Sequence, residues 1–134
     1  MEPLTLDEAT RMLAAGTAKA KEMGIQPVTV AILDPRGDLI ALHRMDGALW
    51  RSVPISQGKA AASAAFDAAS GDLTDRWEGP IVRALSMMEH GRLIPWQGAL
   101  PIRRADGTMI GAIGVSGAKS DEDEAVATAG MAVL

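Results

Sequence analysis

The sequence predicts an α+β fold in which helices pack against an antiparallel sheet. An amphipathic helix with a capped start opens the chain, two pairs of apolar segments are each joined by a turn signal, and alanine-rich or capped helical segments follow each pair. The expected order of elements is α-β-β-α-α-β-β-β-α, which contains five strands. No internal repeat or linker interrupts residues 1–134, and this length is typical of one domain.

The first helix is expected over residues 6–23. Thr5 and Glu8 have the spacing of a capping box, in which the threonine hydroxyl accepts from the Glu8 amide and the carboxylate reaches back. Apolar residues then recur at helical spacing and leave lysines on the opposite face. Gly24 marks the end of this helix, because glycine adopts the left-handed conformation without steric cost.

A β-hairpin is expected to follow. Residues 28–33 (VTVAIL) are apolar at nearly every position, which predicts a strand covered on both faces. Residues 34–38 (DPRGD) carry the turn, since proline fixes φ, glycine supplies a positive φ and aspartate caps locally. Residues 39–45 then return as the partner strand.

Two helical segments are expected in the middle of the chain. Residues 52–69 are rich in alanine, the best helix former, and their small side chains let a sheet approach closely. A second helical stretch over residues 72–89 is interrupted at Gly79-Pro80. Pro80 suits the first position of the part that follows.

The rest of the chain is expected to contain three extended segments and a final helix. The extended segments are residues 93–96, 100–104 and 109–116, with Asp106-Gly107 as the hairpin signal between the last two. Glycines at three positions in and just after the last strand predict that another backbone, or a ligand, comes very close to it. Ser120 is expected to cap the final helix, whose acidic first turn suits the positive end of the helix dipole.

Composition excludes several classes of protein. The chain has 17 acidic and 13 basic residues, so it lacks the basic surface that a nucleic-acid-binding domain needs. The absence of cysteine excludes disulfides, thiolate metal sites and a cysteine nucleophile. No apolar run approaches the roughly 20 residues that span a bilayer, and the N-terminus does not resemble a signal peptide. We therefore expect a cytoplasmic protein that does not enter a membrane.

Four ionisable residues are candidates for chemistry. His43 is expected on an apolar strand face, where it either ligates a metal or is a partly buried structural histidine. Arg44 anchors a ligand carboxylate, or it pairs with Asp46 to fix the turn. Lys59 stands among helical alanines, where it is a buried base or amine nucleophile, or else extends to water.

The glycine-rich stretch 111–117 (GAIGVSG) has two interpretations. It differs from the nucleophile elbow of hydrolases, because alanine stands where the second glycine belongs. Close packing of the last strand is the favoured interpretation. A hydrolase with Ser116 as its nucleophile is the alternative.

Several motifs occur in the order found in one known family. They are residues 44–48 (RMDGA), 58–60 (GKA), 100–102 (LPI) and 110–117 (IGAIGVSG). On these motifs the chain resembles the GlcG/HbpS family, whose module is also the C-terminal domain of PduO-type proteins. The resemblance extends from Leu4 to Gly130.

This resemblance implies a profilin-like fold, with a five-stranded antiparallel sheet, helices on both faces and assembly as a homo-oligomer (dimer or higher). It also implies a link to haem or to a corrinoid. One segment departs from the family pattern, because Trp96-Gln97-Gly98-Ala99 stands where the family has Gly-Gly. The large ring of Trp96 beside this loop indicates pocket contacts specific to this chain.

The first functional hypothesis is a small-molecule-binding protein that takes haem or a related tetrapyrrole. Its pocket is expected near His43, Arg44, Met45, Trp96 and Gly98, with His43 as the metal ligand. If Trp50 and Trp96 converge on this pocket, their rings form its walls.

Two further hypotheses come from other classes. One is a catabolic-pathway enzyme acting on a small carboxylated metabolite, with Arg44 as anchor and His43, Asp46 or Lys59 as acid or base. The other is a non-catalytic oligomeric scaffold, which the small side chains of the helices and the last strand would permit.

Overall fold

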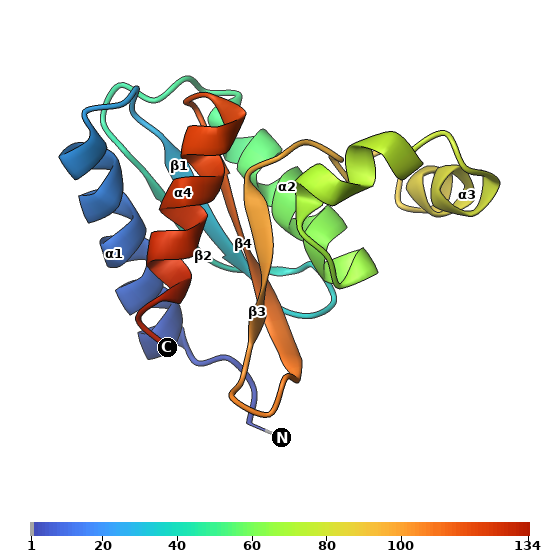
Figure 1. Cartoon of the computed structure of the whole chain (residues 1–134), viewed down its shortest axis with the longest axis horizontal. Coiled ribbons are helices and arrows are strands. Elements are labelled where there is room, and N and C mark those ends of the chain that lie inside the picture. Colours follow the sequence, from blue (N-terminus) through green and yellow to red (C-terminus); the bar gives the residue numbers. More distant parts are fainter. Residues whose placement is uncertain (1) are drawn as a thin grey trace.

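The computed structural model describes residues 2–134 and is shown in Figure 1. Its elements in chain order are α1 (Leu6–Met23), β1 (Thr29–Leu33), β2 (Leu39–Arg44), α2 (Ser52–Phe66), the 3-10 helix η1 (Ser70–Arg76), α3 (Pro80–Met88), β3 (Ala99–Arg103), β4 (Met109–Ser116) and α4 (Ser120–Met131). The α+β class that the sequence predicts is confirmed.

The strands within residues 2–134 form one antiparallel sheet in the order β2-β1-β4-β3. In the centre of the sheet, β1 pairs with β4, and Thr29 lies opposite Ser116. On the outer side of β1, Val30 lies opposite His43 of β2. On the other edge, β3 pairs with β4, with Leu100 opposite Ile113. The hairpin expected over residues 28–45 is therefore present.

The expectation of a fifth strand is wrong. Residues 93–96 form no ladder with any strand in the described part of the chain. Instead the Ile94 amide donates to the Gly58 carbonyl of α2 at 3.0 Å, and Leu93 is buried among the alanines of that helix. Pro95 has no N–H to donate to a ladder, so this segment packs on α2 and not on the sheet.

Helix α1 has the bounds that its sequence predicts. The Thr5 hydroxyl accepts from the Glu8 amide at 3.1 Å, and the Glu8 carboxylate accepts from the Thr5 amide at 3.0 Å. At the other end Gly24 has φ of 65°, which is the left-handed conformation that favours glycine. Both the capping box and the glycine stop are confirmed.

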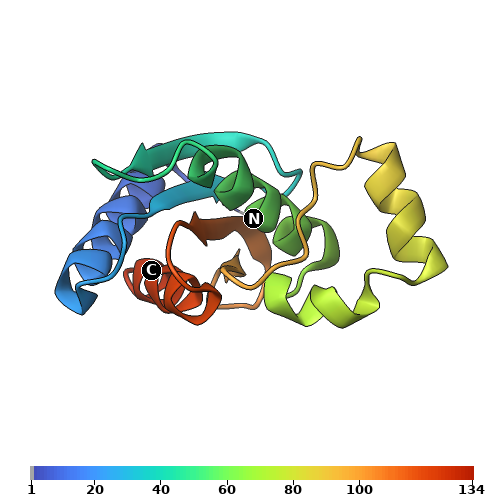
Figure 2. The same ribbon diagram turned by 90° about the horizontal axis from the view of Figure 1, so that it is seen from above.

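Helices cover both faces of the sheet, as expected. Figures 1 and 2 show α1 and α4 side by side on one face and α2 on the other. The first face buries a core with Val30, Ile32 and Ile113 at its centre. The second face buries mainly alanines of α2 against Ala31 and Leu33 of β1. All five residues of β1 are buried, which confirms a strand covered on both sides.

The glycines of β4 allow α2 to lie directly on the strand. A Cβ at Gly114 would overlap the Ser56 carbonyl oxygen and would lie 2.8 Å from the Ala60 Cβ. A Cβ at Gly111 would overlap the Leu33 carbonyl oxygen of β1. These contacts confirm the prediction that another backbone comes very close to the last strand.

Two helix boundaries differ from the sequence prediction. Helix α2 ends at Phe66 instead of residue 69, because Asp67 adopts a left-handed conformation with φ of 50°. Ser120 is the first residue of α4 and not its cap. Lys119 holds the cap position, and its backbone N–H donates to Glu122 Oε1 at 3.1 Å.

The chain between α2 and β3 extends away from the sheet. Pro80 occupies the first turn of α3, as predicted, and Figures 1 and 2 show this helix standing apart beyond η1. Its Ile81, Met87 and Met88 side chains are exposed, whereas Val82 is buried. No helix within residues 2–134 combines the length and the apolarity needed to cross a bilayer.

Candidate functional site

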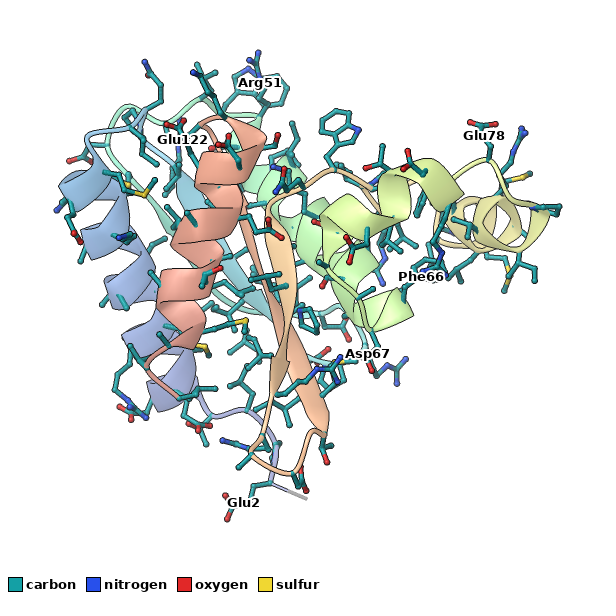
Figure 3. All side chains as sticks on the ribbon, viewed as in Figure 1. Glu2, Arg51, Phe66, Asp67, Glu78 and Glu122 are labelled. Carbon is teal, nitrogen blue, oxygen red and sulfur yellow. The ribbon has the colours of Figure 1, made fainter. Side chains whose placement is uncertain are left out.

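A cleft lies where α2 and α4 begin. It has a volume of about 710 Å³, and we call it the Lys59 cleft after the residue at its floor. Its walls come from the first turns of α2 and α4, the end of β4, the start of η1 and the Trp96-Gln97 loop. Figure 3 shows Arg51, which lines this cleft, at the end of the molecule where α4 starts. Such a volume is typical of pockets that hold small molecules.

The floor of the Lys59 cleft is an ion pair between two buried side chains. Lys59 Nζ lies 3.1 Å from Asp123 Oδ2 and donates to the Val115 carbonyl at 3.0 Å. The other carboxylate oxygen of Asp123 accepts from the Ala118 amide at 3.0 Å. These contacts connect α2, β4 and α4 at one point.

Burial sets the charge behaviour of this pair. The side chains of Lys59 and Asp123 are only 4% and 2% exposed. Burial raises the pKa of the Asp123 carboxyl because it removes water from the charged form, while the Lys59 ammonium and the Ala118 amide oppose that rise. The Lys59 ammonium group is thus the counter-charge of a carboxyl group whose charged form burial disfavours.

Gly98 makes room for the Lys59 ammonium group. Its φ is 141°, and a Cβ at this position would lie 2.8 Å from Lys59 Nζ and 2.7 Å from the Val115 carbonyl oxygen. Its own carbonyl accepts from the Val115 amide at 2.9 Å. Gly98 therefore packs against the ion pair. It is not among the residues that line either cleft.

The rim of the Lys59 cleft combines apolar and polar side chains. Trp96, Leu49 and Ile55 provide its apolar surface. Gln97 Nε2 donates to Glu124 Oε2 at 2.5 Å, which joins the loop before β3 to α4. Among the hydrogen bonds formed by residues 2–134, none involves the Ser116 hydroxyl, although Ser116 is only 7% exposed and lines the cleft.

The second cleft lies between α1 and the end of β2, and we call it the His43 cleft. Its volume is about 350 Å³ and its lining residues are Thr17, Lys21, His43, Arg44, Met45 and Asp46. His43 lies opposite Val30, and Ala41 and Met45 pack on the same core as Val30, so the alternation of β2 turns all three toward the α1 face. Arg44 turns the other way, and its guanidinium donates to the Ala48 carbonyl at 3.1 and 2.7 Å.

Thr17, one of the residues that line the His43 cleft, has a buried hydroxyl group. Its hydroxyl oxygen is buried and is the one buried side-chain N or O atom in residues 2–134 without a hydrogen-bond partner. In the described part of the chain, no three His, Cys, Asp or Glu side chains gather closely enough to hold a metal ion.

The structure divides the candidate residues between the two clefts. His43, Arg44, Met45 and Asp46 line the His43 cleft, whereas Lys59 and Trp96 line the Lys59 cleft. No single pocket therefore contains all the residues expected near His43 and Trp96. Trp50 is 75% exposed and lines neither of these clefts, so the two tryptophan rings do not meet in either one.

Two residues of the Lys59 cleft were not predicted in their roles. Asp123 was expected to serve the helix dipole, yet it is the counter-charge of Lys59. The sequence favours close packing of the strand that carries Ser116, with a nucleophile as the alternative, and the structure places this residue on the cleft wall beside the pair. A buried lysine requires a partner of opposite charge. An acidic residue in the first turn of the helix that follows the glycine-rich strand could therefore have indicated Asp123 as that partner.

The fold and clefts are those of an α+β protein with space for small ligands, and comparison with known proteins supplies the family. The family model described as "Haem degrading protein HbpS-like" matches residues 4–132. The chain therefore belongs to the HbpS-like family.

Two curated relatives are similar over almost the whole chain. An uncharacterised 15.0 kDa protein from the dhaT-dhaS intergenic region of Citrobacter freundii is 32% identical over 92% of this chain and 87% of its own length. The corrinoid adenosyltransferase PduO of Salmonella typhimurium is 26% identical over 98% of this chain. This chain spans only 39% of that larger enzyme.

Solved structures match equally well. A structure described as a PduOC:haem complex has a TM-score of 0.88 and 26% sequence identity, and the match covers 99% of this chain and 96% of that one. A double mutant of HbpS from Streptomyces reticuli has a TM-score of 0.85 and 32% identity, and the match covers 100% of this chain and 88% of that one.

Proposed function

We propose that this chain binds haem and that the His43 cleft holds it. One observation carries the proposal: the similarity of 99% of the chain, at a TM-score of 0.88, to a structure described as a haem complex. Membership of the HbpS-like family agrees with it.

The choice of cleft rests on the side chains that can ligate haem iron. Haem iron is held by histidine, methionine, cysteine or tyrosine side chains. The Lys59 cleft is lined by none of these four residue types, and the sequence contains neither cysteine nor tyrosine. The His43 cleft has an exposed imidazole with Met45 two residues further along the chain. His43 is therefore the proposed iron ligand.

The remaining residues of the His43 cleft suit an anionic macrocycle. Lys21 places positive charge at its rim for the propionates. A single imidazole is a weak site for a bare metal ion. It is sufficient for haem, because the porphyrin itself supplies four nitrogen ligands.

A second copy of the chain is part of this proposal. The cleft volume of about 350 Å³ is at the lower end of the range for ligand pockets, so one chain encloses the macrocycle only in part. A homo-oligomer that covers the open side would exclude water from it. When bound, haem would supply a redox-active iron, and the chain would ligate that iron and hold the propionates.

Titration with haemin tests the proposal. We expect a shifted Soret band that saturates at a fixed ratio of haemin to chain. Lys21→Ala is expected to weaken binding, and Lys119→Ala, which removes an exposed lysine outside the lining of both clefts, is the matched control. Metal-free protoporphyrin IX should bind more weakly, because it offers no iron for His43. A spectrum that stays that of free haemin would refute haem binding.

A further inference from the structure

The floor of the Lys59 cleft is rich in buried polar and charged side chains. Four of the eight buried polar or charged residues in residues 2–134 line this cleft: Ser52, Lys59, Ser116 and Asp123. Burying polar groups costs free energy unless each one finds a partner. Four such residues line this one cleft, and none of them lines the His43 cleft.

Several hydrogen-bonding positions on this floor remain unused. The Lys59 ammonium has three donors, and two of them are accounted for by Val115 and Asp123. The Ser116 hydroxyl makes no hydrogen bond with the residues described and lines the cleft. The Asp123 carboxylate accepts one bond from Ala118 and one from Lys59, which leaves lone pairs free. Ser52, in contrast, is engaged by Thr29 and by the Leu49 carbonyl.

The charges around the floor disfavour a strongly charged ligand. Lys59 and Asp123 cancel each other, so a ligand carboxylate would meet the Asp123 carboxylate and a ligand ammonium would meet the Lys59 ammonium. At the rim, Arg51 is accompanied by Asp72 and Glu124, so the rim carries an excess of negative charge that opposes an anion, and only the Lys59 ammonium at the floor opposes a cation. Hydroxyl groups avoid both conflicts, because each can accept from Lys59 and donate to Asp123.

We propose that the Lys59 cleft binds a small neutral molecule with neighbouring hydroxyl or carbonyl oxygens. The oxygens bind to Lys59, Ser116 and Asp123, and the carbon skeleton packs against Trp96, which lines the cleft and is 54% exposed. The Gln97–Glu124 hydrogen bond fixes the loop that carries this ring.

Three probes of similar size separate the ligand classes in an NMR titration of the ¹⁵N-labelled chain. Glycerol is neutral, glycerate is anionic and 3-amino-1,2-propanediol is cationic. We expect glycerol to shift the amides of Gly117 and Ala118 and the Trp96 indole, and to bind at least about threefold more tightly than either charged probe. Absence of these shifts with glycerol, or equal or tighter binding of a charged probe, would overturn the proposal.

Variants identify the surface on which glycerol binds. Ser116→Ala and Trp96→Ala are each expected to weaken glycerol binding by about threefold to tenfold. Trp50→Ala is the matched control, because this tryptophan is 75% exposed and lines neither cleft. Trp96→Ala removes an exposed side chain, so it remains informative even if Ser116→Ala impairs folding. Unchanged glycerol binding in the Trp96 variant would refute the assignment, whatever haemin does at the His43 cleft.

Discussion

Lys59 of α2 and Asp123 of α4 form an ion pair at the end of β4, with 3.1 Å between Nζ and Oδ2. The two residues are 64 positions apart in sequence, and both side chains are almost fully buried. Because the same ammonium group also binds the Val115 carbonyl, the pair fixes two helices to the central strand. It is at once a structural link and the floor of the Lys59 cleft.

Removing one partner of this pair is expected to destabilise the fold. Lys59→Met leaves the Asp123 carboxyl buried without its counter-charge, and such changes cost about 3–5 kcal/mol. The double variant Lys59→Met/Asp123→Asn removes the charge but keeps an acceptor for the Ala118 amide, so it should recover part of the loss. Urea denaturation measures the free energy of unfolding of the single and the double variant. A single variant within about 1 kcal/mol of the parent chain would show that the pair contributes little.

A methyl group at Gly114 is expected to separate α2 from the sheet. The added Cβ would overlap the Ser56 carbonyl, and backbone cannot move aside as a flexible side chain can. Overpacking of this kind costs about 1–3 kcal/mol. Gly16→Ala in α1 is the matched control, because its Cβ would meet Val126 at an ordinary distance of 3.4 Å.

Gly114→Ala should therefore lower the thermal midpoint, whereas Gly16→Ala should leave it unchanged or raise it. Gly16→Ala is expected to be neutral or to stabilise by up to about 1 kcal/mol, because alanine favours a helix. Calorimetry of both variants checks this. A Gly114→Ala variant as stable as the parent would contradict direct contact between α2 and β4.

The ion pair between Glu8 and Arg104 is expected to make stability depend on pH in the acid range. Arg104 Nη1 and Nη2 lie 2.5 and 2.9 Å from the two carboxylate oxygens of Glu8. The hydrogen bonds from Arg104 and then from the Thr5 amide lower the pKa of Glu8 from 4.5 to about 2. The stabilisation from the ionised carboxylate is complete above the ordinary pKa of 4.5, and it is lost as the pH falls through about 2.

Urea midpoints of the parent chain and Glu8→Gln measure this dependence. Their difference should be constant above pH 4.5 and should narrow as the pH falls toward 2. When the same comparison is made in chains that also carry Arg104→Met, the difference in urea midpoint should depend much less on pH. A difference that stays constant down to pH 2 would contradict the lowered pKa.

Local sequence signals predicted most of the fold. The Thr5–Glu8 capping box, the 34–38 turn and Pro80 at the start of α3 act over a few residues, so their sequence is sufficient evidence. The prediction of a fifth strand failed because tertiary contacts, and not the local sequence, decide where residues 93–96 pack. Residues 93–96 have the sequence pattern of a strand, but their hydrogen bond is to the Gly58 carbonyl of α2 and not to a strand of the sheet.

The sites were harder to predict because they depend on long-range contacts. The grouping of His43 with Met45 and Asp46 follows from their nearness in sequence, and the structure places them in one cleft. Whether Lys59 and Trp96 share that cleft depends on how α2 crosses the sheet, and local sequence patterns do not predict this crossing. The structure places them in the other cleft, where the partner charge comes from Asp123, 64 residues further along the chain.

The most direct test of the central claim compares the two histidines in a haemin titration. His43 lines its cleft, whereas His90 lies just beyond α3, is exposed and lines neither cleft. We expect His43→Ala to lose or shift the Soret band of the complex and to weaken haemin binding at least about tenfold, while His90→Ala titrates like the parent chain. An unchanged spectrum and affinity in His43→Ala would contradict iron ligation in the His43 cleft.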